Sequence, residues 1–175
     1  MLYHASHREG LKELVPAVST HGIIWVYAIN NRLTALLFGV PKDDFDIIMD
    51  EEDGKPVIYE VYKDAVRKLY EGKSCSLYTV SAEGFLKNQT GWEPKLVSEN
   101  IVPVIREEKI NNLYEEIRKA MEENQCIIYE YSEDEVYQWF LREEISERIN
   151  SFGISEEIMR TDSRFTLYIN KLLGR

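Results

Sequence analysis

The stretch IIWVYAINNRLTALLFGVP, residues 23–41, contains the two patterns from which the fold of this chain is predicted. Its first part, Ile23–Ile29, is rich in β-branched and aromatic residues, which favour a strand. Its second part, Asn30–Phe38, has leucines at helical spacing and is followed by Gly39 and then by Pro41, as expected at the end of a helix. The stretch therefore predicts a strand that leads directly into a helix.

Short runs of the same strand-like composition occur throughout the first 105 residues, separated by Gly, Pro, Asn and Asp. The further strands predicted from them are Leu2–His4, Phe45–Met49, Val57–Tyr62, Ser76–Val80 and Ile101–Ile105. A further helix is predicted over Glu9–Leu14, and Asp64–Tyr70 is either a third helix or an extension of the sheet.

The pattern after Arg106 is mainly helical. The elements predicted there are a helix with the apolar stripe Ile110, Leu113, Ile117 and Met121, a strand Cys126–Tyr131, a helix opened by the capping box at Ser132–Glu135 and ending near Asn150, and short helices over Ser155–Arg160 and Ser163–Leu173. The long helix is expected to bury Val136, Phe140, Leu141, Ile145 and Ile149. We therefore predict an α+β protein with a mixed sheet in residues 1–105 and a helical extension, residues 106–175, packed against it.

Composition excludes several classes of protein. The 175 residues are 44% hydrophobic and 11% aromatic, enough for a core, and 31 acidic against 21 basic residues give a net charge of −10. A chain with this charge repels phosphate backbones, so we do not expect it to bind nucleic acid. It has no long apolar run and no apolar signal core near Met1, and a location in the cytoplasm, without membrane insertion, is the expectation.

Common catalytic and metal-binding motifs are missing. The phosphate-binding and dinucleotide-binding glycine patterns and the serine-hydrolase elbow do not occur. Cys75 and Cys126 are far apart and are expected to be reduced, packed thiols. His4, His7 and His21 fall within the first 21 residues, but they lack the further ligands that a zinc site needs, so no metal is expected.

Three residues in characteristic contexts remain as candidates for a site. His4 lies in LYHAS, Tyr27 in WVYAINN directly before the predicted helix, and Glu99 in SENIVPVI, where it is expected to begin a late strand. Over residues 1–105 this order resembles the His–Tyr–Glu layout of the ADP-ribosyltransferase fold of the poly-ADP-ribose polymerase and diphtheria-toxin type. The segments KLYEGKSCSLYTVSAEGF and WEPKLVSENIVPV also resemble small bacterial proteins thought to share that fold.

The resemblance implies an NAD-dependent transfer of ADP-ribose to an acceptor that the sequence does not identify, with NAD as a substrate. His4 would bond a ribose hydroxyl, the backbone at Ala5 would hold the nicotinamide carboxamide, and Tyr27 would stack on the nicotinamide ring. Glu99 would stabilise the positive charge that develops on the ribose as nicotinamide leaves. Ser6 and Arg8 would assist, Arg8 as the nearest cation for the pyrophosphate.

The residues leave alternatives open. Ala5 stands where the family has glycine, and Asn31, one helical turn on from Tyr27, is polar where a second stacking ring would be expected. Other acids could occupy the place of Glu99, and these are Glu60, Glu83 and Glu93. A related branch that removes a 2′-phosphate from RNA would need more cations than Arg8, Arg32 and His21 provide.

A different class of function is a catalytically inert module on the same scaffold. It would engage a protein partner through the helical extension, where Tyr137, Trp139 and Phe140 cannot all face one core. The alternative is that these rings pack across the junction between the sheet and the extension.

Overall fold

The computed structural model describes residues 1–18, 23–42, 45–155, 159 and 167–174. These residues form two compact units, each built from separate stretches of the chain. Unit 1 comprises Met1–Pro41 and Leu69–Asn124, and unit 2 comprises Lys42–Lys68 and Gln125–Arg175. This division differs from the boundary predicted at residue 105, which falls inside the nine-residue strand β9 (Val102–Ile110). Strand pairing, and not the change from strand-like to helical pattern, decides where the units divide.

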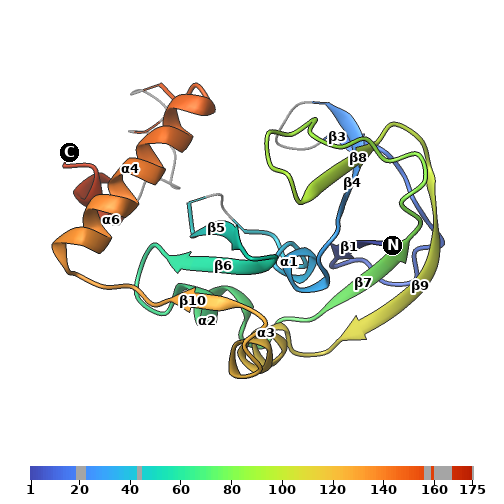
Figure 1. Ribbon diagram of the computed structural model, residues 1–175, viewed down its shortest axis with the longest axis horizontal. Coiled ribbons are helices and arrows are strands. Elements are labelled where there is room, and N and C mark those ends of the chain that lie inside the picture. Colours follow the sequence, from blue (N-terminus) through green and yellow to red (C-terminus); the bar gives the residue numbers. More distant parts are fainter. Residues whose placement is uncertain (19–22, 43–44, 156–158, 160–166, 175) are drawn as a thin grey trace. The chain divides into compact units, whose positions relative to one another are not determined.

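Unit 1 is a seven-stranded sheet with two helices, and its strand order is β2-β9-β7-β1-β4-β3, with β8 paired to β4 as well (Figure 1). Its strands are β1 (Leu2–Ser6), β2 (Glu13–Leu14), β3 (Ala17–Val18), β4 (Ile24–Ile29), β7 (Cys75–Val80), β8 (Lys95–Ser98) and β9. Its helices are α1 (Arg32–Leu36) and α3 (Leu113–Glu122). The protein is therefore α+β, as predicted. The strand pairs described in this sheet are all antiparallel, so the mixed sheet predicted for residues 1–105 is wrong.

Two groups of strands meet in this sheet at one residue pair. β1 pairs with β7 along its whole length, from Leu2 opposite Val80 to Ser6 opposite Ser76, and β4 pairs with β8 from Val26 to Ile29. The register between β1 and β4 consists of Tyr3 opposite Ile29. In Figure 1, β4 runs with β3 and β8, and β1 runs with β7. β1 and β4 therefore separate just after Tyr3, beside His4.

One face of the sheet carries a hydrophobic cluster of unit 1. Its buried members are Leu2, Leu14, Val26, Ala28, Tyr78, Val80, Leu96 and Val102. Because side chains alternate along a strand, Trp25 and Tyr27 lie on the other face of β4 from Val26 and Ala28. Both faces of the strand predicted over Ile23–Ile29 are largely covered, because Trp25 and Ile29 are only 9% and 4% exposed, while Tyr27 between them is partly exposed.

The helix predicted after this strand is present but shorter. Asn31 is its N-cap, because its side-chain oxygen accepts hydrogen bonds from the backbone N–H groups of Leu33 and Thr34, at 2.9 and 3.1 Å. The last turn closes at Gly39, whose N–H donates to the carbonyl of Leu36 at 2.9 Å. A Cβ at Gly39 would lie 2.6 Å from the sulfur of Cys75, on β7. The absence of a side chain is what allows α1 to approach β7 so closely.

Gly39→Ala is expected to destabilise the protein by about 1–3 kcal/mol, the usual cost of forcing extra atoms into a packed site. The cost should be smaller in a Cys75→Ala background, because the closest atom is then gone, although the Cys75 Cβ at 3.0 Å remains. Urea denaturation of the four proteins of this double-mutant cycle measures the coupling. Equal costs in both backgrounds would contradict the steric explanation.

The helix predicted over Glu9–Leu14 is wrong. Gly10 has a positive φ of 72°, and residues 13 and 14 form β2. The loop backbone is satisfied by side chains from distant strands. The Tyr78 hydroxyl donates to the carbonyl of Arg8 at 2.6 Å, and Glu107 accepts from the N–H of Gly10 at 3.0 Å. These long-range bonds replace the local bonds of a helix.

Unit 2 combines a three-stranded sheet with helices. Its strands are β5 (Ile47–Glu52), β6 (Lys55–Glu60) and β10 (Ile127–Tyr129), in the order β10-β6-β5. Its described helices are α4 (Glu135–Ser151) and α6 (Leu167–Leu172), and α2 (Ala65–Tyr70) begins in this unit and ends in unit 1. Asp53 and Gly54, both with positive φ, join β5 to β6 in the tight turn that suits a hairpin. β10 then adds in parallel to β6.

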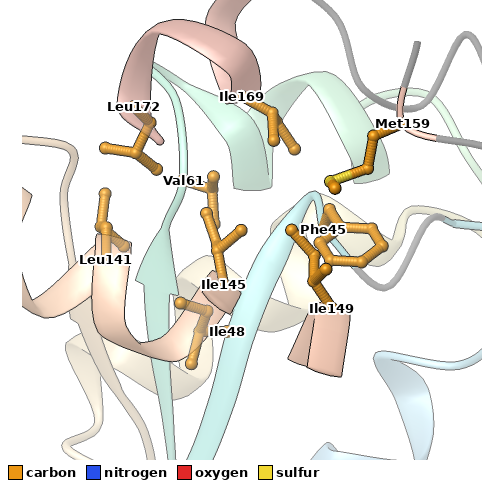
Figure 2. Close-up of a cluster of buried hydrophobic side chains, with 9 residues drawn as sticks. All are labelled: Phe45, Ile48, Val61, Leu141, Ile145, Ile149, Met159, Ile169 and Leu172. Carbon is orange, nitrogen blue, oxygen red and sulfur yellow. The ribbon is translucent and has the colours of Figure 1, made fainter. Parts of the chain in front are cut away.

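The core of unit 2 forms between α4, the sheet and the C-terminal segment (Figure 2). Its buried members are Phe45, Ile48, Val61, Leu141, Ile145, Ile149, Met159, Ile169 and Leu172. Three of the five residues expected to be buried in α4 are in this core. Phe140 packs against it while partly exposed, but Val136 is 77% exposed, so that prediction is wrong. Of the helix predicted over Ser155–Arg160, only Ser155 and Met159 are described, and the N–H of Met159 donates to the carbonyl of Ser155 at 3.0 Å. The start of the helix predicted at Ser163 lies outside the described residues.

Candidate functional site

His4 lies where β1 separates from β4, and its side chain bonds to the neighbouring strand. Its Nδ1 lies 2.8 Å from the carbonyl oxygen of Tyr27. Because a carbonyl can only accept, Nδ1 carries a proton, and Nε2 is then the acceptor nitrogen of a neutral ring. Burial lowers the pKa of His4, and the bond to the Tyr27 carbonyl opposes this effect. His4 is therefore an oriented, neutral imidazole that can accept a hydrogen bond from a hydroxyl.

The lowered pKa of His4 predicts that this residue makes folding depend on pH. An unfolded chain protonates the ring near the ordinary pKa of 6.5, before the folded protein does. The contribution of the neutral ring to the free energy of unfolding is therefore complete above the ordinary pKa of 6.5. This contribution is lost as the pH falls from 6.5 towards the lower pKa of the folded protein. The free energy of unfolding of His4→Gln should be lower than that of the wild type at about pH 7.5, and the difference should become smaller at about pH 5.5. Urea denaturation at both pH values measures this, and a constant deficit would contradict it.

Tyr27 lies in an aromatic cluster that surrounds one cation. The ammonium of Lys95, in β8, is 4.9 Å from the centre of the Tyr27 ring and 5.6 Å from that of Phe38. Trp25 makes an edge contact with Tyr27 at 6.1 Å between ring centres, and Trp92 lies 6.0 Å from Phe38. All five residues belong to unit 1. We call Tyr27, Phe38 and Lys95 the ring site.

Phe38 is a residue that the sequence analysis did not identify. A second stacking ring would have been expected one helical turn after Tyr27, at Asn31. Asn31 instead caps α1. Phe38 follows α1, and its backbone N–H donates to the carbonyl of Ala35 at 3.0 Å. A signal did exist, since Phe38 is an aromatic residue directly before the glycine that ends the helix. Only the tertiary structure places its ring against the cation that Tyr27 also contacts.

Glu99 lies in a turn between β8 and β9. The prediction that it begins a strand is therefore wrong. Ser98 lies opposite Val26 in the register of β8 with β4, so Glu99 follows directly after the last paired residue. The turn is held by the Ser98 hydroxyl, which accepts from the N–H of Asn100 at 3.2 Å. The Glu99 side chain is exposed. Tyr27 therefore lies in β4, and Glu99 lies in the turn that follows the neighbouring strand β8.

The other acids considered for this role have different surroundings. Glu83 and Glu93 are exposed residues of turns in unit 1. Glu60 belongs to unit 2 and is only 6% exposed. Its two carboxylate oxygens accept from the N–H groups of Val66 and Tyr131, at 2.9 and 3.3 Å. Glu60 therefore stabilises the backbone of unit 2, whereas Glu83 and Glu93 remain competitors of Glu99.

Ala5, Ser6 and Arg8 follow His4 along the chain. Ala5 is buried opposite Leu77, and the Ser6 hydroxyl accepts from the N–H of Arg8 at 3.1 Å. The Arg8 side chain is exposed, beside the end of β1. Arg32, the other described cation considered for a phosphate, forms ion pairs with Glu108 and Glu116. Its guanidinium lowers the pKa of Glu108, and the two ion pairs link α1 to β9 and α3.

His21 lies outside the described residues. Cys75 and Cys126 are both buried and neither forms a disulfide, as predicted. Burial raises the pKa of the Cys75 thiol to about 11, which keeps it protonated and unsuited to act as a nucleophile. Among the described residues, no group of three or more His, Cys, Asp or Glu side chains could hold a metal ion.

Trp139 and Val136 form an exposed apolar pair on α4. They are 59% and 77% exposed and lie three residues apart, on one side of the helix. Tyr137 is partly buried, and its hydroxyl lies 3.0 Å from the carbonyl oxygens of both Glu60 and Tyr129. Of the three aromatic residues considered there, Trp139 is thus the exposed one.

Comparison of the chain with family models, with curated proteins and with solved structures found no match. Within the described ranges no helix has the length and apolar character needed to cross a membrane. The function of this protein is therefore inferred from the residues of unit 1 and from their geometry.

Proposed function

We propose that unit 1 binds NAD and transfers its ADP-ribose to an acceptor, on a sheet of the ADP-ribosyltransferase type. The observation that carries this proposal is the ring site, in which Tyr27 and Phe38 both contact one positive charge. The nicotinamide ring of NAD is flat and positively charged, and aromatic faces bind such a ring through stacking and cation–π attraction.

The arrangement of the strands supports the same proposal. β1, β4 and β8 are successive neighbours, and they carry His4, Tyr27 and the turn with Glu99. In the transfer, the bond between the ribose C1′ and the nicotinamide nitrogen breaks, and its electron pair leaves with nicotinamide. Positive charge develops on the ribose, and the Glu99 carboxylate stabilises it. The acceptor then forms the new bond to C1′ and loses its proton.

The remaining residues have binding roles in this proposal. His4 accepts a hydrogen bond from a ribose hydroxyl at Nε2, since Nδ1 is used by the Tyr27 carbonyl. The backbone at Ala5 holds the carboxamide of nicotinamide. Ser6 lies beside it, and Arg8 supplies a positive charge for the pyrophosphate. Neutral His4 suits this role, because a protonated ring could not accept a hydrogen bond from the ribose.

The test measures NAD binding by calorimetry and release of nicotinamide over time. We expect saturable binding and nicotinamide release that both weaken in Tyr27→Leu, which removes a stacking face. Lys55→Gln, in unit 2, is the control and should match the wild type. If the wild-type protein neither binds NAD nor releases nicotinamide, the proposal is wrong.

A second candidate is a catalytically inert module that binds a protein partner, and the exposed pair Val136 and Trp139 favours it. In that case NAD is not turned over, and the apolar pair lies in an interface. Light scattering of the wild type and of Trp139→Ser tests for self-association through this surface. A wild type that is monomeric at all concentrations excludes a second copy of the chain as the partner.

A further inference from the structure

Lys95 occupies the position between the two rings, although its backbone belongs to a regular strand. It is the first residue of β8, its N–H donates to the carbonyl of Trp92 at 3.1 Å, and it lies opposite Ile29 of β4. The backbone is therefore held in place, and the long side chain carries the ammonium to Tyr27 and Phe38. Lys95 is partly buried, so the charge is partly removed from water.

The contacts of the ammonium are those that a cationic ring would need. A cation within about 6 Å of an aromatic centre is attracted to the face of the ring. Both distances, 4.9 and 5.6 Å, meet that condition. A pyridinium ring stacked on Tyr27 or Phe38 would use the same faces, and it would also be repelled by an ammonium that stayed beside it. The two cations therefore exclude one another.

We propose that Lys95 is an internal competitor for the ring site and so determines how tightly this site binds its ligand. The ammonium holds the ring faces in the ligand-free protein and leaves when a flat cation enters. This inference rests on the proposed function, because it takes the nicotinamide ring as the ligand. In this exchange, a cationic ligand replaces the cation–π attraction that is lost when Lys95 moves away. An uncharged ring replaces less of it and should therefore bind less tightly.

The first experiment measures the affinity of two probes, NAD and 1-methylnicotinamide, by calorimetry. Lys95→Met keeps most of the chain length without the charge, and we expect it to bind both probes about 3- to 10-fold more tightly. Lys95→Arg keeps a stacking cation and should bind no more tightly than the wild type. Lys87→Met, which removes an exposed lysine of unit 1, is the matched control. Lys95→Gln serves as a second neutral variant if Lys95→Met does not fold.

The second experiment observes Lys95 directly by NMR of protein with ¹³C at the lysine Cε atoms. In the ligand-free protein, ring currents from Tyr27 and Phe38 should shift the Lys95 signal, which is assigned by its loss in Lys95→Arg. Adding 1-methylnicotinamide should move this signal towards those of exposed lysines. A Lys95 signal that is unshifted without ligand would overturn the proposal.

The outcomes separate this inference from the proposed function. If the wild type releases nicotinamide but neither neutral variant of Lys95 binds the probes more tightly, the competitor role is wrong and the transferase function stands. If the neutral variants bind more tightly but no protein releases nicotinamide, the competitor role is supported and the transfer reaction is wrong. If no variant binds either probe, both are wrong.

Discussion

Glu99→Gln is expected to slow nicotinamide release by about 100- to 1,000-fold, the usual effect of removing one group that stabilises transition-state charge. Glutamine keeps the size of the side chain and removes the negative charge that, in the proposed reaction, stabilises the positive charge developing on the ribose. Because Glu99 is exposed in a turn, its replacement removes little packing, and the melting temperature should stay nearly unchanged. NAD affinity should also change much less than the rate. Initial rates at saturating NAD and a thermal melt measure these effects.

Glu83→Gln and Glu93→Gln are the matched controls, since both are exposed acids of unit 1 turns. Neither should change the rate if Glu99 is the catalytic carboxylate. A large loss of rate in Glu93→Gln together with a normal rate in Glu99→Gln would assign the role to Glu93 instead. That result would contradict our assignment while preserving the proposed reaction.

Ile145→Ala is expected to destabilise unit 2 by about 2–5 kcal/mol, the range for removing large aliphatic side chains from a packed core. Ile145 is fully buried between Leu141 and Ile149 on the inner side of α4 (Figure 2). The substitution removes apolar contacts and leaves a cavity that the neighbours fill only in part. Urea denaturation followed by far-ultraviolet circular dichroism measures the loss.

Val136→Ala, on the same helix, is the control. Its side chain is 77% exposed, so the substitution should change stability by no more than about 0.5 kcal/mol. Since the chain has two units, the unfolding curve is to be analysed for two transitions before a free energy is assigned. Equal effects of the two substitutions would contradict the packing of α4 described here.

Elements with a strong local pattern were predicted well. The strand and helix of residues 23–38 appear as β4 and α1, and the Asn112-capped helix α3 buries Leu113 and Ile117 as its spacing indicated. Two other residues of that predicted stripe are placed differently. Ile110 is the last residue of β9 and not part of the helix. Met121 is 42% exposed, and Ala120 is buried instead. Helical periodicity sets which side of a helix is apolar, but the neighbouring elements decide how far that side is covered.

The division into units was not predictable from local patterns. β10 pairs in parallel with β6, with Ile127 opposite Val57, and this joins two stretches of chain that are far apart in sequence. β8 (Lys95–Ser98) was not identified as a strand from the sequence. Pairing of this kind depends on which distant strand offers a matching edge, and neither composition nor periodicity carries that information.

The amino-acid sequence alone determined that this is an α+β chain with a strand–helix element at its centre, because side-chain shape and spacing act within a few residues. It also indicated His4, Tyr27 and Glu99 as residues in unusual contexts. Only the tertiary structure decided that the His4 imidazole bonds the Tyr27 carbonyl and that Phe38 and Lys95 join Tyr27 in the ring site. Those contacts arise where strands and a helix end meet in space, and they depend on sheet pairing that no local pattern encodes.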